Sequence, residues 1–365
     1  MNESTATRVQ RLRRTSQVVG VLVGVAWLIV VVTTPVGRWM ADRVLVVAGG
    51  GETPPGWAAV LLYLSALVVV WKGLALPAAT LVAARGERRV RRHASTGSVV
   101  SAGLRDVWIS AAVAVALGAV TWALLDVAGP WWWMVAGLLG APVLVGATAL
   151  AGVTVRAGGR TPVARPVLVE RLARLTEQAC GRPVPVLEWA GTAGTSATAL
   201  VTGVGQSGAI LLGRTLVEDW SDDEVVVVVA HELAHHVHRD LWRKAALDAC
   251  LLVAVLGAAH LVATYVGPGL GVEGRQDLLV LPMIGLATWV AWWLLRPVRL
   301  AQSRAQERLA DRYALDVTGD REAFRAALRR MAAHHFAEER PSTLTQMFFH
   351  RHPTVDERLR AAGSQ

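Results

Sequence analysis

The sequence contains few charged residues and almost no cysteine. Charged side chains make up 18% of its 365 residues and hydrophobic ones 53%, a balance too apolar for an ordinary soluble protein of this length. Two cysteines, Cys180 and Cys250, are too few for a disulfide framework or a cysteine-bound metal, and we expect both to be small buried thiols. The composition therefore favours a membrane protein.

Six stretches of about 20 mostly apolar residues are long enough to cross a lipid bilayer. We interpret the first as a retained anchor, because it is long for a signal peptide and no clear cleavage site follows it. The six predicted spans are Val18–Thr34, Trp57–Ala84, Val107–Ala128, Trp131–Val155, Ala245–Val266 and Leu278–Pro297.

The chain has a net charge of +9, and its arginines are distributed in a pattern that alternates with these spans. Arginines cluster before the first span and after the second, fourth and sixth, whereas the intervening loops carry few. Because positive residues accumulate at the cytoplasmic ends of spans, this alternation predicts a multi-pass protein of the cell membrane with both termini in the cytoplasm. The lipid bilayer is its expected partner, and the basicity requires no nucleic acid.

Four segments are expected along the chain. Residues 1–156 form a membrane part with four spans, residues 157–244 a soluble helix and small sheet, residues 245–297 two more spans, and residues 298–365 a helical C-terminal part. The elements predicted outside the spans are a linker at Gly158–Pro162, helices at Pro166–Cys180, Gln302–Thr318 and Arg321–Arg340, and strands at Val184–Trp189, Ala197–Thr202 and Ala209–Leu212.

The most specific motif is His231-Glu232-Leu233-Ala234-His235, just before the fifth span. Residues four apart stand on the same face of a helix, so the two imidazoles can share one Zn²⁺. Glu232, between them in sequence, can act as a general base towards water. The pentapeptide alone is equally compatible with a helix that carries two incidental histidines.

The residues before the motif favour a helix. Ser221 and Glu224 form a capping box, in which each side chain accepts the backbone N–H of the other residue. The run Val225–Val229 would otherwise read as a buried strand, because β-branched residues favour sheets. We expect a helix that is buried on all sides.

Catalytic zinc usually has three protein ligands, so the two histidines leave one to be found. Glu307 and Asp311 lie four apart on a predicted helix, so Glu307 can bind the metal while Asp311 accepts the N–H of a ligand histidine. The same pair could instead belong to a solvated acidic face among arginines. The other candidates are His236, His238, His334, His335, His350 and His352.

Taken together, these motifs resemble those of the integral-membrane gluzincins that include the CaaX prenyl proteases and the HtpX heat-shock proteases. The matching pieces are the pentapeptide with Asp240 after it, Glu307-Arg-Leu-Ala-Asp311, and His352-Pro353 followed by Glu357-Arg358. The resemblance implies a predominantly α-helical polytopic membrane protein with a small α+β zincin-like metalloprotease domain. It also implies one zinc ion per chain, held by His231, His235 and Glu307.

Two further roles are implied by the resemblance. Glu232 would be the general base, and His352 would lie near the metal and help to stabilise the oxyanion. Relatives usually carry Asn-Ala on the strand beside the cleft, whereas this chain has Thr195 and Ser196 in the corresponding region. A contact to the substrate backbone or to the oxyanion is therefore expected to differ.

The predicted function is that of a zinc-dependent metalloendopeptidase at the cytoplasmic membrane face. Its substrates would be membrane-associated or misfolded proteins, and a sheet edge beside the metal could receive an extended peptide by strand addition. Two alternatives stay open: a signalling metallopeptidase that cleaves one cytoplasmic regulator, and a non-catalytic membrane scaffold. The intact Glu232 argues against a scaffold, which has no need for a base.

Overall fold

The chain groups into two compact units, each of which is described by itself. The computed structural model describes residues 19–20, 22–49, 54–90, 96–154, 160–189, 199–202, 209–334 and 341–363. Of the described residues, the sheet-containing unit comprises those in Ala141–Asp248 and from Arg296 onwards, and the helical unit comprises those in Arg8–Gly140 and Ala249–Leu295. The four expected segments remain a prediction about domain organisation.

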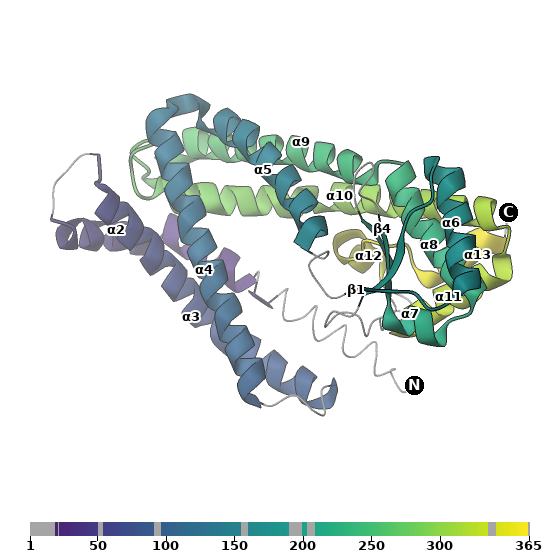
Figure 1. Ribbon diagram of the computed structural model, residues 1–365. Coiled ribbons are helices and arrows are strands. Elements are labelled where there is room, and N and C mark those ends of the chain that lie inside the picture. Colours follow the sequence, from purple (N-terminus) through teal and green to yellow (C-terminus); the bar gives the residue numbers. More distant parts are fainter. Residues whose placement is uncertain are drawn as a thin grey trace. The chain divides into compact units, whose positions relative to one another are not determined.

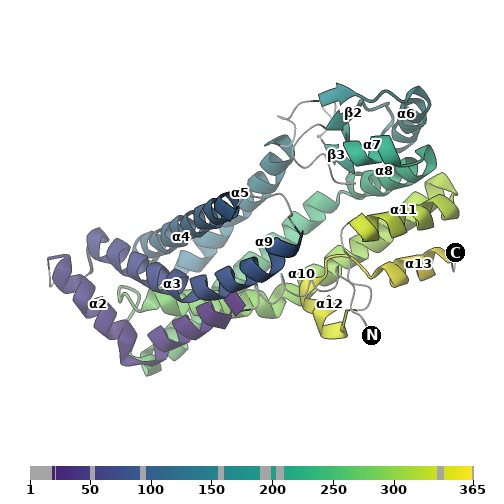
Figure 2. The ribbon, with the colours of Figure 1, turned by 90° about the horizontal axis from the view of Figure 1, so that it is seen from below.

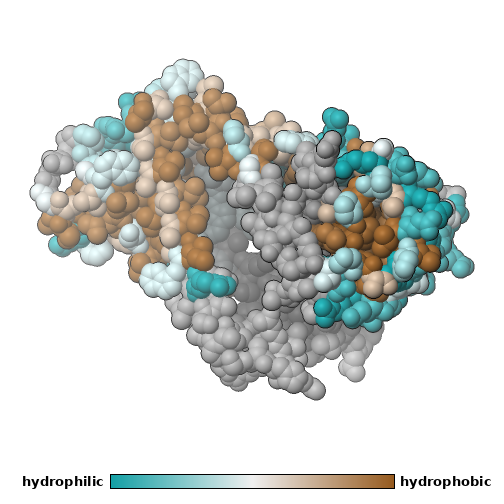
Figure 3. Space-filling view, in the orientation of Figure 1, coloured by the Kyte–Doolittle hydropathy of each residue, from teal (hydrophilic) through white to brown (hydrophobic). Residues whose placement is uncertain are grey.

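The helical unit is built from long apolar helices, as the composition predicts. In the described part of the chain, five helices are long and apolar enough to cross a membrane. Figure 3 shows hydrophobic side chains over the visible face of α3 and α4, and Val113, Leu117 and Val120 of α4 are exposed. The helices that contribute to this unit are α2 (Pro35–Val47), α3 (Trp57–Val90), α4 (Thr96–Val127), α5 (Trp132–Thr154), α9 (Asp240–Leu261) and α10 (Val280–Thr318).

The first predicted span is the start of a broken pair of helices. Leu22–Thr33 and α2 meet at an angle of 76°, and counting them as one span gives up to six. Thr34 is extended and caps α2, because the following proline disfavours a helical conformation at the residue before it. The break therefore follows from Pro35.

Short helical segments connect the longer helices in the helical unit. A 3₁₀ turn, η1 (Gly129–Trp131), joins α4 to α5. After α9, the chain continues through η4 (Val262–Val266) and η5 (Gly267–Leu270) before α10 begins. Asp277 closes this connection by pairing with Arg38 at 2.8 Å.

The sheet-containing unit has a mixed four-stranded sheet in the order β1-β2-β4-β3. Strand β2 pairs with β4 in parallel, whereas β1 and β3 are antiparallel edge strands. The predicted linker was wrong at its end, because Arg160–Pro162 pairs with β2 as a strand. The strands are β1 (Arg160–Pro162), β2 (Val186–Trp189), β3 (Ala199–Thr202) and β4 (Ala209–Gly213).

Helix α8 (Asp222–Val237) lies between α6 (Pro166–Cys180) and α11 (Arg321–His334), as Figures 1 and 2 show. The predicted capping box is confirmed, since the Ser221 hydroxyl and the Glu224 carboxylate each accept the other residue's backbone N–H. The valine run is helical and buried, as expected.

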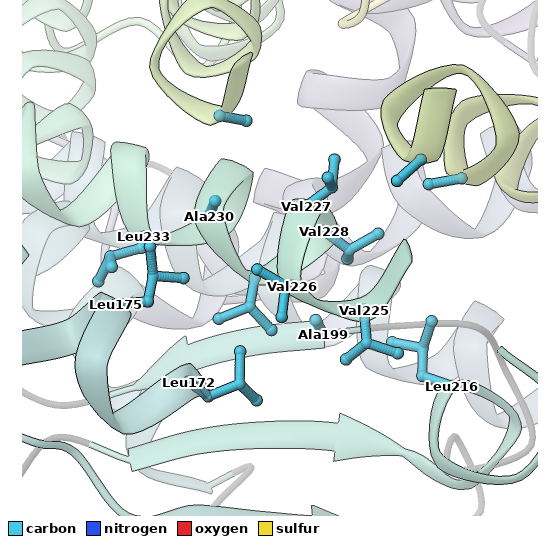
Figure 4. Packing of buried hydrophobic residues seen from close by; sticks show 14 of the residues in the cluster. Leu172, Leu175, Ala199, Leu216, Val225, Val226, Val227, Val228, Ala230 and Leu233 are labelled. Carbon is cyan, nitrogen blue, oxygen red and sulfur yellow. The ribbon is translucent and has the colours of Figure 1, made fainter. Parts of the chain in front are cut away.

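The valines of α8 form the centre of this unit's core. In Figure 4, Val226 lies near Leu172 of α6 and Ala199 of β3, and Val225 lies near Leu216 of α7 (Arg214–Asp219). Five consecutive branched side chains can be helical here because the helix is covered on several sides, and the burial outweighs their preference for strands. This packing holds the histidines of α8 in a fixed position.

Helix α10 is longer than the sequence suggested. The predicted span Leu278–Pro297 and the predicted helix Gln302–Thr318 form one continuous helix, with Pro297 inside it. A proline removes one backbone hydrogen bond, and the turns on either side maintain the helix. Glu307 and Asp311 are consequently carried by the same helix as an apolar segment.

Two short helices complete the C-terminal part, α12 (Thr343–Phe349) and α13 (Val355–Gly363). The expectation of buried cysteines was wrong, because Cys180 and Cys250 are both exposed. Cys180 is the last residue of amphipathic α6, and Cys250 lies on the apolar helix α9, where an exposed thiol can face lipid.

Candidate metal centre

Helix α8 presents its two motif histidines side by side. The rings of His231 and His235 are perpendicular, with centroids 5.0 Å apart. Spacing of four residues produces this arrangement, because successive turns place such side chains one above the other. The two imidazoles line one face of α8, and the valine run before them is packed in the core.

Glu307 of α10 faces both imidazoles. Its Oε2 lies 3.4 Å from His231 Nε2, and its Oε1 lies 3.6 Å from His235 Nε2. One ligand atom from each of the three residues lies within 4.8 Å of the other two. Glu307 itself is 6% exposed. A carboxylate and two ring nitrogens thus converge on one point.

The spacing of these atoms fits a tetrahedral metal ion. Ligands at about 2.0–2.1 Å from a zinc ion lie about 3.3 Å from one another in a tetrahedron. The two separations between Glu307 and the histidines are close to that value. The donor set of two imidazoles and one carboxylate also leaves a fourth position open, as catalytic sites require. The residues present therefore fit a bound divalent metal.

Two more carboxylates orient the imidazoles. Asp311 Oδ1 lies 3.0 Å from His231 Nδ1, and Asp240 Oδ2 lies 2.8 Å from His235 Nδ1. A carboxylate beside Nδ1 holds the proton there and leaves Nε2 as the lone-pair donor. Both Nε2 atoms point to Glu307, so each histidine is set in the tautomer that a metal needs.

Arg358 of α13 fixes Asp311 in turn. Its guanidinium donates from Nε at 2.8 Å and from Nη2 at 2.5 Å to the two oxygens of Asp311. Burial acts to lower the pKa of Arg358, but the hydrogen bonds to Asp311 outweigh it and the pKa is raised. The Asp311 carboxylate is therefore held by α13 as well as by its own helix.

The carboxylates around His231 favour its protonated form when no metal is bound. Burial alone would lower the pKa of the imidazole, but Asp311 and Glu307 raise it to about 9. Metal binding must displace a proton from this ring, because neutral imidazole is the ligand. The negative charge of this site is thus balanced by either a proton or a cation.

Glu232 lies among these groups. Burial raises the pKa of its carboxyl, while the nearby His231 and His235 act to lower it. Among the described residues, no hydrogen bond engages its carboxylate. A carboxylate that is close to the cluster but not committed to another contact can accept a proton from water.

His352 is brought to the same point from the C-terminal part. Its Nδ1 lies 2.9 Å from Glu307 Oε2, and its side chain is 62% exposed. The residue follows α12 and precedes Pro353, far from α8 in sequence. An exposed imidazole beside a buried cluster can contact a molecule that approaches from solvent.

Among the described side chains, the remaining candidate ligands are not part of the three-residue cluster. His236 is exposed, and the ring of His238 packs at 5.8 Å from that of Tyr313. His350 contributes its carbonyl oxygen to Arg304. The His334 side chain, His335, Thr195 and Ser196 lie outside the described residues, so the expected change near the missing asparagine remains a prediction.

Sequence reasoning gave no role to Asp240. Arg239 has a φ of 54°, in the left-handed region, and this turn brings Asp240 back towards His235. Helical spacing from His235 does not predict such a contact. The signal that could have found it was the resemblance, whose first matching piece includes Asp240 after the pentapeptide.

Asp240→Asn is expected to weaken zinc binding about 10–100-fold, because an amide orients the His235 tautomer less firmly than a carboxylate. Competition with a chromophoric chelator measures the affinity. Asp316→Asn, an exposed change on α10, serves as the matched control and should retain wild-type affinity. Equal affinities in the wild type and both variants would contradict a positioning role for Asp240.

Comparison with known proteins matches the C-terminal half of the chain to one family. Residues 165–365 match the family model of Peptidase family M48. The chain is 30% identical over 173 residues to the uncharacterized metalloprotease YhfN of Bacillus subtilis (strain 168), covering 46% of this chain and 40% of that protein. The chain thus spans less than half of the length of this relative.

The chain is also similar to a second protease and to a solved structure. Protease HtpX of Glaesserella parasuis is 29% identical over 214 residues, covering 53% of this chain and 71% of that protein. The crystal structure of S. mikatae Ste24p aligns with a TM-score of 0.63 and 16% identity, over 89% of this chain and 79% of that one. At this identity the structural likeness concerns the fold alone.

Proposed function

Because the chain belongs to peptidase family M48, a family of metalloproteases, we propose that it is a membrane-embedded zinc-dependent metalloendopeptidase. Family membership confirms the resemblance expected from the motifs. The observation that carries the proposal is the convergence of three ligand atoms within 4.8 Å, beside an uncommitted glutamate.

His231, His235 and Glu307 would hold one zinc ion per chain. Two imidazoles and a carboxylate suit zinc better than magnesium or calcium, which prefer oxygen ligands. Zinc at this position would polarise the scissile carbonyl and lower the pKa of water to about 7. Asp311 and Asp240 would keep both histidines in the required tautomer.

Glu232 would act as the general base and then as the general acid. Its carboxylate accepts a proton from the attacking water and passes that proton to the leaving amine of the substrate. His352, exposed at the edge of the cluster, would donate a hydrogen bond to the carbonyl oxygen as negative charge develops there. Peptide-bond hydrolysis needs no group beyond these.

The substrates we propose are membrane-associated or misfolded proteins, cut at the cytoplasmic membrane face. Support comes from the long apolar helices and from the alternation of arginine clusters along the sequence. Both termini and the metal centre would face the cytoplasm. The edge strand β3 would receive the substrate as an additional strand.

The full chain purified in detergent is expected to contain about one zinc per molecule and to cleave unfolded casein. A chelator should abolish cleavage, and added zinc should restore it, because two imidazoles and a carboxylate bind the ion reversibly. Elemental analysis and gel electrophoresis provide the two measurements. Cleavage that resists chelation would contradict the proposal, and zinc without casein cleavage would favour the signalling or scaffold alternative.

A further inference from the structure

Basic side chains surround one buried carboxylate near the point where α10 leaves its apolar segment. Asp248 of α9 is 3% exposed and accepts hydrogen bonds from the Arg299 guanidinium at 2.5 and 3.1 Å. Lys244 lies one helical turn before Asp248, within electrostatic range of Asp248, Arg299 and Arg351. Among the described residues, Asp248 is the one carboxylate that acts on Lys244.

Arg296 extends this group towards α12. Its Nε donates to the Phe348 carbonyl oxygen at 2.7 Å, and its guanidinium lies 5.8 Å from the Phe349 ring centroid. Arg299 and Arg351 are positive charges that act on Arg296. We call Lys244, Arg296, Arg299 and Arg351 the basic cluster. Within the described part of the chain, these four basic side chains lie near the Asp248 carboxylate, which already accepts hydrogen bonds from Arg299.

Lys244 and Arg351 differ from Arg296 and Arg299, whose guanidinium groups contact the described part of the chain. Among the described residues, no hydrogen bond or ion pair engages the side chain of Lys244 or of Arg351. Lys244 is half-buried, so the like charges around it are screened less than they would be in water. An anion bound between Lys244 and Arg351 would relieve this repulsion.

The surroundings indicate which anion fits. Leu241 and Trp242 of α9 and Leu294 and Val298 of α10 are exposed apolar residues close in sequence to the basic cluster. Exposed apolar side chains on long apolar helices suit acyl chains, and tryptophan is enriched at the level of lipid headgroups. Arg296 contacts α12. Leu344 of that helix is 69% exposed. An anion with an attached apolar part satisfies both features.

We propose that the basic cluster binds the phosphate of an anionic phospholipid. Lys244 and Arg351 would hold the phosphate oxygens, with Arg296 and Arg299 supplying further positive charge. Arg351 directly precedes His352, whose Nδ1 lies 2.9 Å from Glu307. A bound headgroup would therefore also fix the segment that brings His352 to the metal centre. The binding itself does not depend on the proposed proteolysis.

Native mass spectrometry of the full chain in detergent tests this proposal, with phosphatidylglycerol and phosphatidylcholine of identical acyl chains as probes. One phosphatidylglycerol should bind about tenfold more tightly than phosphatidylcholine. Lys244→Gln and Arg351→Gln should each weaken phosphatidylglycerol binding about fivefold, since a basic residue near an anionic surface contributes about that much. Arg243→Gln removes the same charge from an exposed neighbouring position and should change binding less than twofold.

Three results would overturn the proposal. If Arg243→Gln weakened phosphatidylglycerol binding as much as Lys244→Gln and Arg351→Gln do, the lipid would be held by general attraction between opposite charges and not at a defined site. Equal affinity for phosphatidylcholine would mean that the headgroup charge is not recognised. Displacement of phosphatidylglycerol by millimolar inorganic phosphate would assign the cluster to a soluble phosphate compound. Circular dichroism of each variant verifies that the fold is retained.

Discussion

Replacing Glu232 with glutamine is expected to slow casein cleavage about 10²–10⁴-fold while zinc binding persists. This corresponds to a barrier about 3–5 kcal/mol higher. The physical reason is that glutamine keeps the size of the side chain but cannot accept a proton from water. Glu232 is also not one of the three clustered ligand atoms, so the donor set for the metal stays complete.

Two measurements on Glu232→Gln separate the base from the ligands. Elemental analysis should give about one zinc per chain in both proteins, and the initial cleavage rate should fall in the variant alone. Glu177→Gln makes the same chemical change at an exposed position on α6 and should leave the rate unchanged. Undiminished cleavage by Glu232→Gln would exclude this residue as the base, and lost zinc would show that it supports the metal.

The local parts of the site could be predicted because helical geometry governs them. Spacing of four residues places His231 beside His235 and Glu307 beside Asp311, whatever the rest of the fold. The capping box marked the start of α8 in the same way. The roles of these residues in binding and catalysis remain predictions.

Contacts that depend on chain reversals could not be predicted in the same way. Asp240 reaches His235 through a left-handed residue, and Arg358 reaches Asp311 across 47 positions of sequence. No periodicity connects such residues, because tertiary packing decides which surfaces of the helices meet. The approach of His352 to Glu307 was anticipated from the resemblance alone, since sequence spacing gives no such distance.

The membrane helices show a similar division. Their apolar stretches could be predicted from the sequence, because about 20 apolar residues are needed to cross a bilayer. The ends of these helices could not be predicted, because hydropathy does not show whether a helix continues into polar sequence. Helix α10 passes through Pro297 and carries Glu307 ten residues later. Hydropathy alone therefore placed a boundary inside a continuous helix.

Removing the Glu307 carboxylate is expected to have the largest effect on the metal. Glu307→Ala deletes the one ligand that faces both imidazoles, leaving two protein ligands for an ion that usually takes three. Zinc affinity should fall by more than about 100-fold, the upper end of the cost of losing an outer partner of a ligand. Elemental analysis after dialysis should then give almost no zinc, and casein cleavage should be lost with it.

Two further variants test whether the loss of zinc is specific to the Glu307 carboxylate. Glu322→Ala, at an exposed position in the first turn of α11, should keep one zinc per chain. Glu307→Gln keeps the volume and one oxygen, so it should bind zinc more tightly than Glu307→Ala but less tightly than wild type. If Glu307→Ala retained its zinc, the third ligand would have to be another group. His352 would be the first candidate, because its Nδ1 already lies 2.9 Å from the position that Glu307 Oε2 would vacate.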